Sequence, residues 1–200
     1  MRSSPFLLIL TLLGGVLSFA QAPTEITENG KDRFEAEFAP GGRLEVHIRS
    51  GDVLVLGTEE SKIRIEYSGR NADQARDVTV RLKRDGTSGN LGISGGPRNE
   101  FQITVRIPKQ TDLFLRMPAG ELNVEKTIGS KDIELHAGDM TVELGKIEDY
   151  QHVDASVNTG GLDADAFSVS KGGLFRSFKK DGSGKYTVHA HVGAGQLTLR

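Results

Sequence analysis

The sequence predicts an all-β protein: a right-handed β-solenoid, or β-helix-like repeat domain, with an antiparallel meander, or alternatively a β-sandwich. Three observations lead to this prediction. Apolar and polar residues alternate with a period of two over much of the chain after residue 44, glycine makes up 25 of 200 residues, and one glycine-centred pattern occurs five times. A period of two is typical of strands, whose successive side chains point to opposite faces. Abundant glycine favours many backbone corners.

The first twenty residues have the layout of a secretory signal peptide. Met1-Arg2 is basic, residues 6–19 form an uncharged and mostly apolar run, and small residues precede a cleavage point after Ala20. The run is shorter than the roughly 20 apolar residues of a membrane-spanning helix. We therefore expect a signal peptide (1–20), a lead-in segment (21–39) and one β domain (40–200), exported to the periplasm, the cell surface or the medium.

Composition narrows the function classes. The chain has no cysteine, so a domain of this size must depend on its hydrophobic core rather than on disulfides. Its formal net charge is −2, which gives no indication of a nucleic-acid partner.

Five segments show the strand alternation most clearly, and one short segment, 71–76, is typical of a helical turn. The strand segments are 44–49, 63–67, 78–82, 101–107 and 186–192. Each has one apolar and one polar face, so each is expected to bury one side.

The repeat is anchored on Gly51, Gly120, Gly138, Gly160 and Gly195. The residues five and three before each glycine, and two and four after it, are apolar in all twenty cases. Inward positions are thus odd before the glycine and even after it, and a straight strand cannot shift its phase in this way. We predict a corner or bulge at each glycine, because positive φ and close backbone approach are tolerated best there.

Three stretches carry a resemblance to a known family. They are LEVHIRSGDVLV (44–55), IRIEYSG (63–69) and FQITVRIPKQTDLFLRMPAGELNV (101–124), followed by further glycine-centred repeats. Over residues 40–200 the chain resembles the bacterial putative-adhesin family, exported domains of unknown function. The resemblance implies a β-helix-like fold and a location in the cell envelope, and it implies no catalytic residues. The chain departs from the pattern at Gly160-Gly161 and in 167–186.

An acidic column follows the corner glycines. Asp52, Glu121 and Asp139 come directly after three of them, while Gly161 and Gln196 take the same position in the other two repeats. Stacked about 4.8 Å apart, the carboxylates would form a ladder with the ligand chemistry for Ca²⁺ or for work on a sugar. The simpler interpretation is that acidic residues suit a glycine turn, and we expect no metal site here.

A pair of histidines, His189 and His191, shares one face of a predicted strand. Binding of Zn²⁺ or Cu²⁺ would need a third ligand from a neighbouring strand. The residues in the same column as His191 do not repeat a ligand type, so we interpret the pair as part of an ordinary polar face and expect no cofactor. That column contains His47, Arg116, Glu134 and Ser156.

The segment 167–186 interrupts the repeat and holds the candidate ligand-binding residues. Asp181-Gly182 is typical of a hairpin turn. Aromatic and basic side chains on one exposed tip would suit an anionic polysaccharide or lipid headgroups, whereas a plain hairpin would bury one Phe and leave the lysines in water. The candidates are Phe175, Arg176, Phe178, Lys179, Lys180 and Lys185.

No nucleophile elbow, catalytic triad or phosphate loop occurs in the sequence, and we expect no enzymatic activity. The first hypothesis is an exported envelope or surface module, either an adhesin-like binding domain or a structural scaffold. Its partner would be an envelope polysaccharide, a membrane surface or another envelope protein.

Two alternatives to this first hypothesis remain open. A carbohydrate-active β-helix enzyme would need two or three carboxylates and a basic residue on adjacent rungs. A self-associating envelope protein is suggested by the terminal strand Gln196–Arg200, which has no evident cap.

Overall fold

The computed structural model describes residues 24–30, 33–97 and 99–200. The predicted signal peptide, 1–20, and the start of the lead-in lie outside these residues. Thirteen strands form one mixed sheet that does not close on itself, so the all-β prediction is confirmed. No helix in the described ranges is long and apolar enough to cross a membrane.

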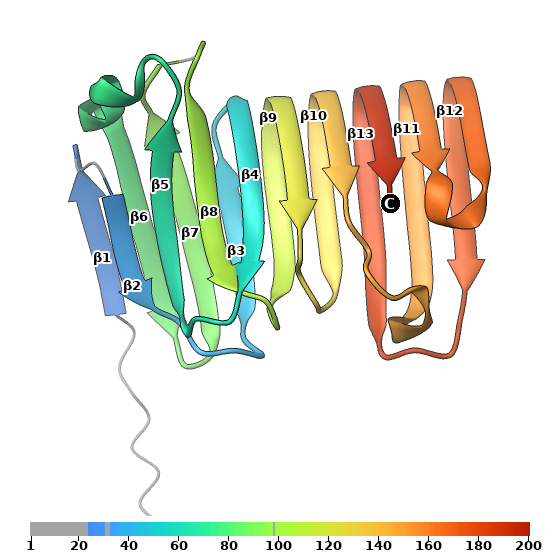
Figure 1. Ribbon diagram of the computed structural model, residues 1–200, viewed down its shortest axis with the longest axis horizontal. Coiled ribbons are helices and arrows are strands. Elements are labelled where there is room, and N and C mark those ends of the chain that lie inside the picture. Colours follow the sequence, from blue (N-terminus) through green and yellow to red (C-terminus); the bar gives the residue numbers. More distant parts are fainter. Residues whose placement is uncertain (1–23, 31–32, 98) are drawn as a thin grey trace, which may run out of the picture.

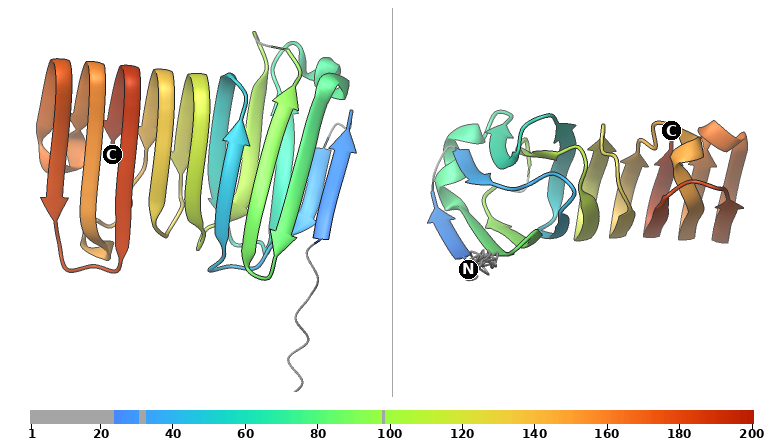
Figure 2. Two further views of the ribbon diagram at one scale, coloured as in Figure 1. Left: turned by 180° about the vertical axis from the view of Figure 1, so that it is seen from behind. Right: turned by 90° about the horizontal axis from the view of Figure 1, so that it is seen from below.

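The N-terminal half has two facing layers (Figure 1 and Figure 2), an arrangement compatible with the β-sandwich alternative. The back layer has the strand order β1-β6-β7-β3, and the front layer has the order β2-β5-β8-β4. The predicted helical turn is a 3₁₀ helix, η1 (Ala72–Asp77). The strands are β1 (Thr24–Asn29), β2 (Arg33–Glu37), β3 (Arg43–Ile48), β4 (Gly51–Thr58), β5 (Lys62–Ser68), β6 (Val78–Asp85), β7 (Ser88–Gly95) and β8 (Gln102–Pro108).

The predicted antiparallel meander is present only in part, because the sheet is mixed. β1–β6, β6–β7, β2–β5 and β5–β8 are antiparallel, but β3–β7 and β4–β8 are parallel. The reason is that β3 and β4 are the two arms of one bent segment. They pair in parallel with the first and second arms of the next long strand, and this fixes their direction.

The C-terminal half consists of five long strands that bend over, so that each contributes an arm to both layers (Figure 1). We call each bent strand a rung, and β3 with β4 forms the first rung. The 3₁₀ turns η2 (Ile147–Asp149) and η3 (Asp165–Phe167) lie in the connections. The long strands are β9 (Asp112–Glu125), β10 (Lys131–Val142), β11 (Tyr150–Ala164), β12 (Val169–Asp181) and β13 (Tyr186–Leu199).

The spatial order of the rungs differs from their order in the chain. β13 lies between β10 and β11 and runs parallel to both, which gives the order β9-β10-β13-β11-β12. Gln196 is therefore paired with Asp139 on one side and with Gly161 on the other. The expected free edge at the C-terminal strand is wrong, because this strand fills an interior position. The open edge at this end is β12.

The five repeat glycines lie side by side where the rungs bend, in the order Gly51, Gly120, Gly138, Gly195, Gly160. All have positive φ, between 124° and 154°. A Cβ built on Gly138 would lie 1.9 Å from the carbonyl oxygen of Gly120, and one on Gly195 would lie 1.9 Å from that of Gly138. In this glycine ladder the next backbone occupies the space of the missing side chain.

The core lies between the two arms of the rungs. In one column the residues five before the corner glycine pair from rung to rung, and all are fully buried: Val46, Leu115, Ile133, Ala190 and Ala155. On the other arm, the residues two positions after the glycine also pair from rung to rung and are buried: Val53, Leu122, Met140, Leu197 and Leu162. Stacking of equivalent residues thus gives one continuous apolar interior along the molecule.

Candidate functional site

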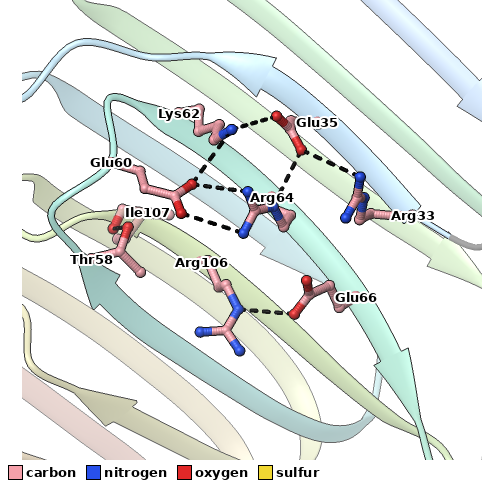
Figure 3. A network of polar contacts seen from close by, with 9 residues as sticks. All are labelled: Arg33, Glu35, Thr58, Glu60, Lys62, Arg64, Glu66, Arg106 and Ile107. Carbon is pink, nitrogen blue, oxygen red and sulfur yellow. Dashed lines mark hydrogen bonds and ion pairs between the residues drawn. The ribbon is translucent and has the colours of Figure 1, made fainter.

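The outer face of the front layer carries a closed ion-pair network (Figure 3). Glu35 on β2 accepts hydrogen bonds from Lys62 at 2.6 Å and from Arg64 at 3.2 Å, both on β5. The hydrogen bond from Lys62, followed by that from Arg64, lowers the pKa of the Glu35 carboxyl. Arg106 on β8 similarly contacts Glu66 at 2.8 Å. Because the charges here satisfy one another, this face offers little to a charged ligand.

The outer face of the back layer carries a groove of about 930 Å³. It crosses six strands: β1, β6, β7, β3, β9 and β10. Its apolar residues include Ile48, Ile93 and Met117, whose side chains belong mainly to the core. The remaining lining residues are Glu25, His47, Arg49, Thr79, Arg81, Lys83, Asn90, Gly92, Ser94, Arg116, Pro118, Glu134 and His136.

The groove is basic, although the chain as a whole is acidic. Four of its lining residues are lysine or arginine, two are glutamate, and two more are histidine, whereas the whole sequence has a net charge of −2. Arg81 is exposed, and its guanidinium lies 3.9 Å from Glu25, a loose contact. Lys83 is also exposed and has no hydrogen-bond or ion-pair partner in the described part of the chain. Arg81 and Lys83 can therefore attract an anionic ligand without first breaking a strong internal ion pair.

Arg116 forms an ion-pair cluster at the edge of the groove. Its guanidinium lies 2.9 Å from the carboxylate of Asp132 and 3.2 Å from that of Glu134, both on β10. The ligand atoms of Asp132, Glu134 and His189 lie within 4.8 Å of one another, and no other such group of three occurs among the described residues. His189 thus has two carboxylates from a neighbouring strand close enough to serve as further ligands. Both of these carboxylates, however, already form ion pairs with Arg116.

The other predicted histidine has different neighbours. The register places His191 between Glu134 and Ser156, in the predicted column. Its Nδ1 lies 2.9 Å from the Ser156 hydroxyl. His191 therefore shares a strand face with His189 without joining the group of three ligand atoms.

The predicted acidic column is also adjacent in space. Asp52 pairs with Glu121 and Glu121 with Asp139. Each carboxylate has a nearby amide donor: the Gln102 side chain donates to Asp52, the Asn123 side chain to Glu121 and the Gln196 backbone to Asp139. The column is a row of individually hydrogen-bonded carboxylates.

The candidate ligand-binding segment is not a hairpin tip. β12 pairs with β11, whereas β13 pairs with β10 and β11, so the Asp181-Gly182 turn leads across β11 instead of joining paired strands. Phe175, at the bend of β12, is separated by a whole arm of the strand from Lys185, which precedes β13. The prediction of a single exposed tip that contains both residues is therefore wrong.

The remaining residues of this segment have distinct environments. Phe178 packs against Phe167, with ring centroids 4.9 Å apart. Lys179 lies 3.0 Å from Asp154, and the Lys185 ammonium lies over the Tyr186 ring. Arg176 and Lys180 are exposed on β12.

One buried polar site was not predicted. The Lys131 side chain, 1% exposed, donates to the Tyr150 hydroxyl at 2.7 Å and to the Thr127 and Gly129 carbonyls at 3.1 and 3.3 Å. Tyr150 in turn donates to the Leu144 carbonyl at 2.9 Å. Burial lowers the pKa of Lys131 to about 8 and raises that of Tyr150. These groups form a polar plug inside the core.

Comparisons with known proteins give a distant structural likeness. No family model and no curated protein matches the chain. The chain is similar to the crystal structure of a putative cell adhesion protein from Clostridium sporogenes, with 15% sequence identity and a TM-score of 0.49. The match covers 89% of this chain and 99% of the other.

Proposed function

We propose that this protein is a non-enzymatic binding module of the cell envelope or cell surface, adhesin-like in the loose sense, and that its groove holds an anionic polysaccharide. The observation that carries the proposal is the basic groove on the outer face of the back layer. An open, shallow site across six strands suits an extended polymer, and its arginine and lysine side chains suit carboxylate or sulfate groups. Export rests on the signal-peptide pattern of residues 1–20.

We further infer that the rungs form a short β-solenoid built onto the two-layered N-terminal half. In-register parallel pairing of β9, β10, β13 and β11 supports this assignment, as does the glycine ladder. In such an arrangement each rung supports its neighbours, so the groove residues project from a rigid wall. A rigid wall lowers the entropy cost of binding, which is what a non-enzymatic scaffold can contribute.

The groove is tested by removing its two exposed cations, Arg81→Ser with Lys83→Ser. We expect binding of dextran sulfate and polygalacturonate to weaken about tenfold, because each exposed cation contributes up to about 1 kcal/mol to a charged contact. Isothermal titration calorimetry measures the affinity. Binding by the unaltered protein should also weaken between about 0.1 and 0.5 M salt, where screening becomes strong.

The matched control is the double variant Lys179→Ser with Lys180→Ser, which removes the same charge at the far end of the molecule and should leave the affinity for these polymers unchanged. Neutral dextran should not bind. Equal losses in the two double variants would show that only overall charge matters, and the groove proposal would then be wrong.

One observation favours a second candidate, a carbohydrate-active enzyme. Asp132 and Glu134 lie on one rung beside the groove, and Arg116 lies on the next, which is the arrangement that the enzyme hypothesis requires. The Arg116 contacts weaken this candidate, because both carboxylates are held in ion pairs. Incubation with polygalacturonate, followed by assays for new reducing ends and for unsaturated products, tests it. We expect neither product, and turnover that Glu134→Gln abolishes would favour the enzyme.

A further inference from the structure

The end of the stack formed by β12 is built differently from the other rungs. β12 pairs with β11 alone, in antiparallel orientation, and Gly173 lies opposite the corner glycine Gly160. Gly173 also has positive φ, 116°. β12 is therefore a last rung that follows the same bend in the reverse chain direction.

Three inward positions of this last rung carry charges where other rungs carry aliphatic residues, whereas Val169 and Phe178 take two further inward positions and pack against the core. Lys171 lies opposite Leu162, Arg176 opposite Val157, and Lys180 opposite Val153. The Lys171 ammonium donates to the Ser177 carbonyl at 2.8 Å, which joins the two arms of the rung. Inward-pointing charges on an edge strand oppose the addition of another strand. A second copy stacked on this end would have to bury them.

The bend of β12 exposes two large apolar side chains. Leu174 and Phe175 are 61% and 80% exposed, and the other large hydrophobic residue exposed in the described ranges is Ile128, at 37%. Phe175 has φ 52°, a conformation that costs a non-glycine residue energy. The residue just before each of the five repeat glycines is small. Rung stacking thus gives no reason for an exposed Leu-Phe pair here.

We propose that the β12 end docks onto the surface of an anionic phospholipid bilayer. Leu174 and Phe175 enter the headgroup region, and the cations of β12 contact lipid phosphates. Strand β12 itself carries four cations and one carboxylate, Asp181, which is paired with His152. The carboxylates that contact it from β11 are Asp154, paired with Lys179, and Asp163, which accepts a hydrogen bond from Ser170. The cations are Lys171, Arg176, Lys179 and Lys180.

A lipid surface fits both features of this end. A bilayer interface takes up apolar side chains and attracts cations within a Debye length, at about 1 kcal/mol for each Lys or Arg. Pairing with another β-strand would use neither the Leu-Phe pair nor the inward charges. Docking here leaves the groove, on the outer face of the back layer, outside the contact, so this inference does not depend on the groove ligand.

The test uses a tryptophan reporter, because the chain contains no tryptophan. Phe175→Trp places a single fluorophore at the bend. With vesicles of phosphatidylcholine containing about one-third phosphatidylglycerol, we expect a blue shift of its emission and quenching by brominated lipid. Phe114→Trp, on the outer face of β9 beneath Arg43, is the control reporter and should show neither effect.

Two double variants separate the contributions, measured by cosedimentation with the same vesicles. Leu174→Ser with Phe175→Ser should weaken binding at least tenfold, and Lys179→Ser with Lys180→Ser about tenfold, with loss of the preference over pure phosphatidylcholine. Arg81→Ser with Lys83→Ser should have no effect.

Three results would overturn the proposal. The first is an emission of the Phe175→Trp variant that anionic vesicles do not shift. The second is an absence of vesicle binding together with an affinity for dextran sulfate that Lys179→Ser with Lys180→Ser weakens, which would indicate a polysaccharide ligand at this end. The third is concentration-dependent sedimentation that Leu174→Ser with Phe175→Ser abolishes, which would indicate a second copy.

Discussion

Replacing Gly138 by alanine is expected to destabilise the protein by on the order of 4 kcal/mol or to prevent folding. Gly138 has φ 124°, and its added Cβ would lie 1.9 Å from the Gly120 carbonyl oxygen. That atom is backbone held in the parallel pairing of β9 and β10, so it cannot rotate away. The two rungs would have to separate at the bend. Urea unfolding followed by far-UV circular dichroism measures the loss.

Two other glycines are the controls. At Gly51, the first of the glycine ladder, φ is 154° but the nearest atom to an added Cβ is the Arg49 guanidinium, 3.8 Å away. Gly51→Ala should therefore cost only the conformational strain, about 1–2 kcal/mol. Gly172 has open space around it, and Gly172→Ala should be nearly neutral. Equal losses at Gly51 and Gly138 would contradict the idea that close stacking of backbones selects glycine in the ladder.

The ladder and the apolar columns are the part of the fold that the sequence predicts best. A phase shift in alternation at a glycine has one simple cause, a bend that keeps the same side chains inside, and the pattern at Gly120 and Gly138 expresses it directly. The order of the rungs was not predictable in this way. Every rung has the same apolar columns, so β13 fits between β10 and β11 as well as it would fit at the end. Local pattern does not encode that choice.

The groove was missed for a related reason. Arg81 and Lys83 alternate with buried residues of β6 as any solvent-facing strand residues do, and their sequence gives no sign that His136, far along the chain, lies in the same groove. A site that spans several strands can be recognised only when it is known which strands pair with one another. The 175–185 segment was predicted as one tip because aromatic and basic residues are adjacent in sequence. Because β12 bends at Gly173, the residues at the bend and those at the end of the strand lie in different parts of the structure.

Lys131 did leave a signal in the sequence. It stands seven residues before Gly138, and the residues at that position in the other repeats are all aliphatic and buried: Leu44, Leu113, Val153 and Val188. The register pairs Lys131 with Leu113 on one side and with Val188 on the other. A lysine in an apolar column predicts a buried cation with polar acceptors nearby, which is what the Tyr150 hydroxyl and two carbonyls provide.

This buried lysine should make stability depend on pH. Burial lowers the pKa of Lys131 from 10.5 to about 8. Between these values the unfolded chain binds the proton more tightly than the folded one, so the free energy of unfolding rises with pH through this window. The full interval corresponds to roughly 3 kcal/mol. Relative to Lys131→Met, the unaltered protein should therefore gain roughly 2–3 kcal/mol between about pH 7 and pH 10.

The difference between the two proteins is the informative quantity, because the other titrating groups are common to both and largely cancel. Methionine has a similar unbranched length, and it removes the cost of burying a charge. It also leaves the Thr127 and Gly129 carbonyls without their donor, which is unfavourable. The stability of the variant near pH 7 therefore depends on the balance of these two effects. The change of the difference with pH isolates the charge. Lys146→Met, at an exposed position in the loop before η2, should give a curve parallel to that of the unaltered protein. If the Lys131→Met curve is also parallel to that of the unaltered protein, then burial does not lower the pKa of Lys131. The prediction would then be wrong.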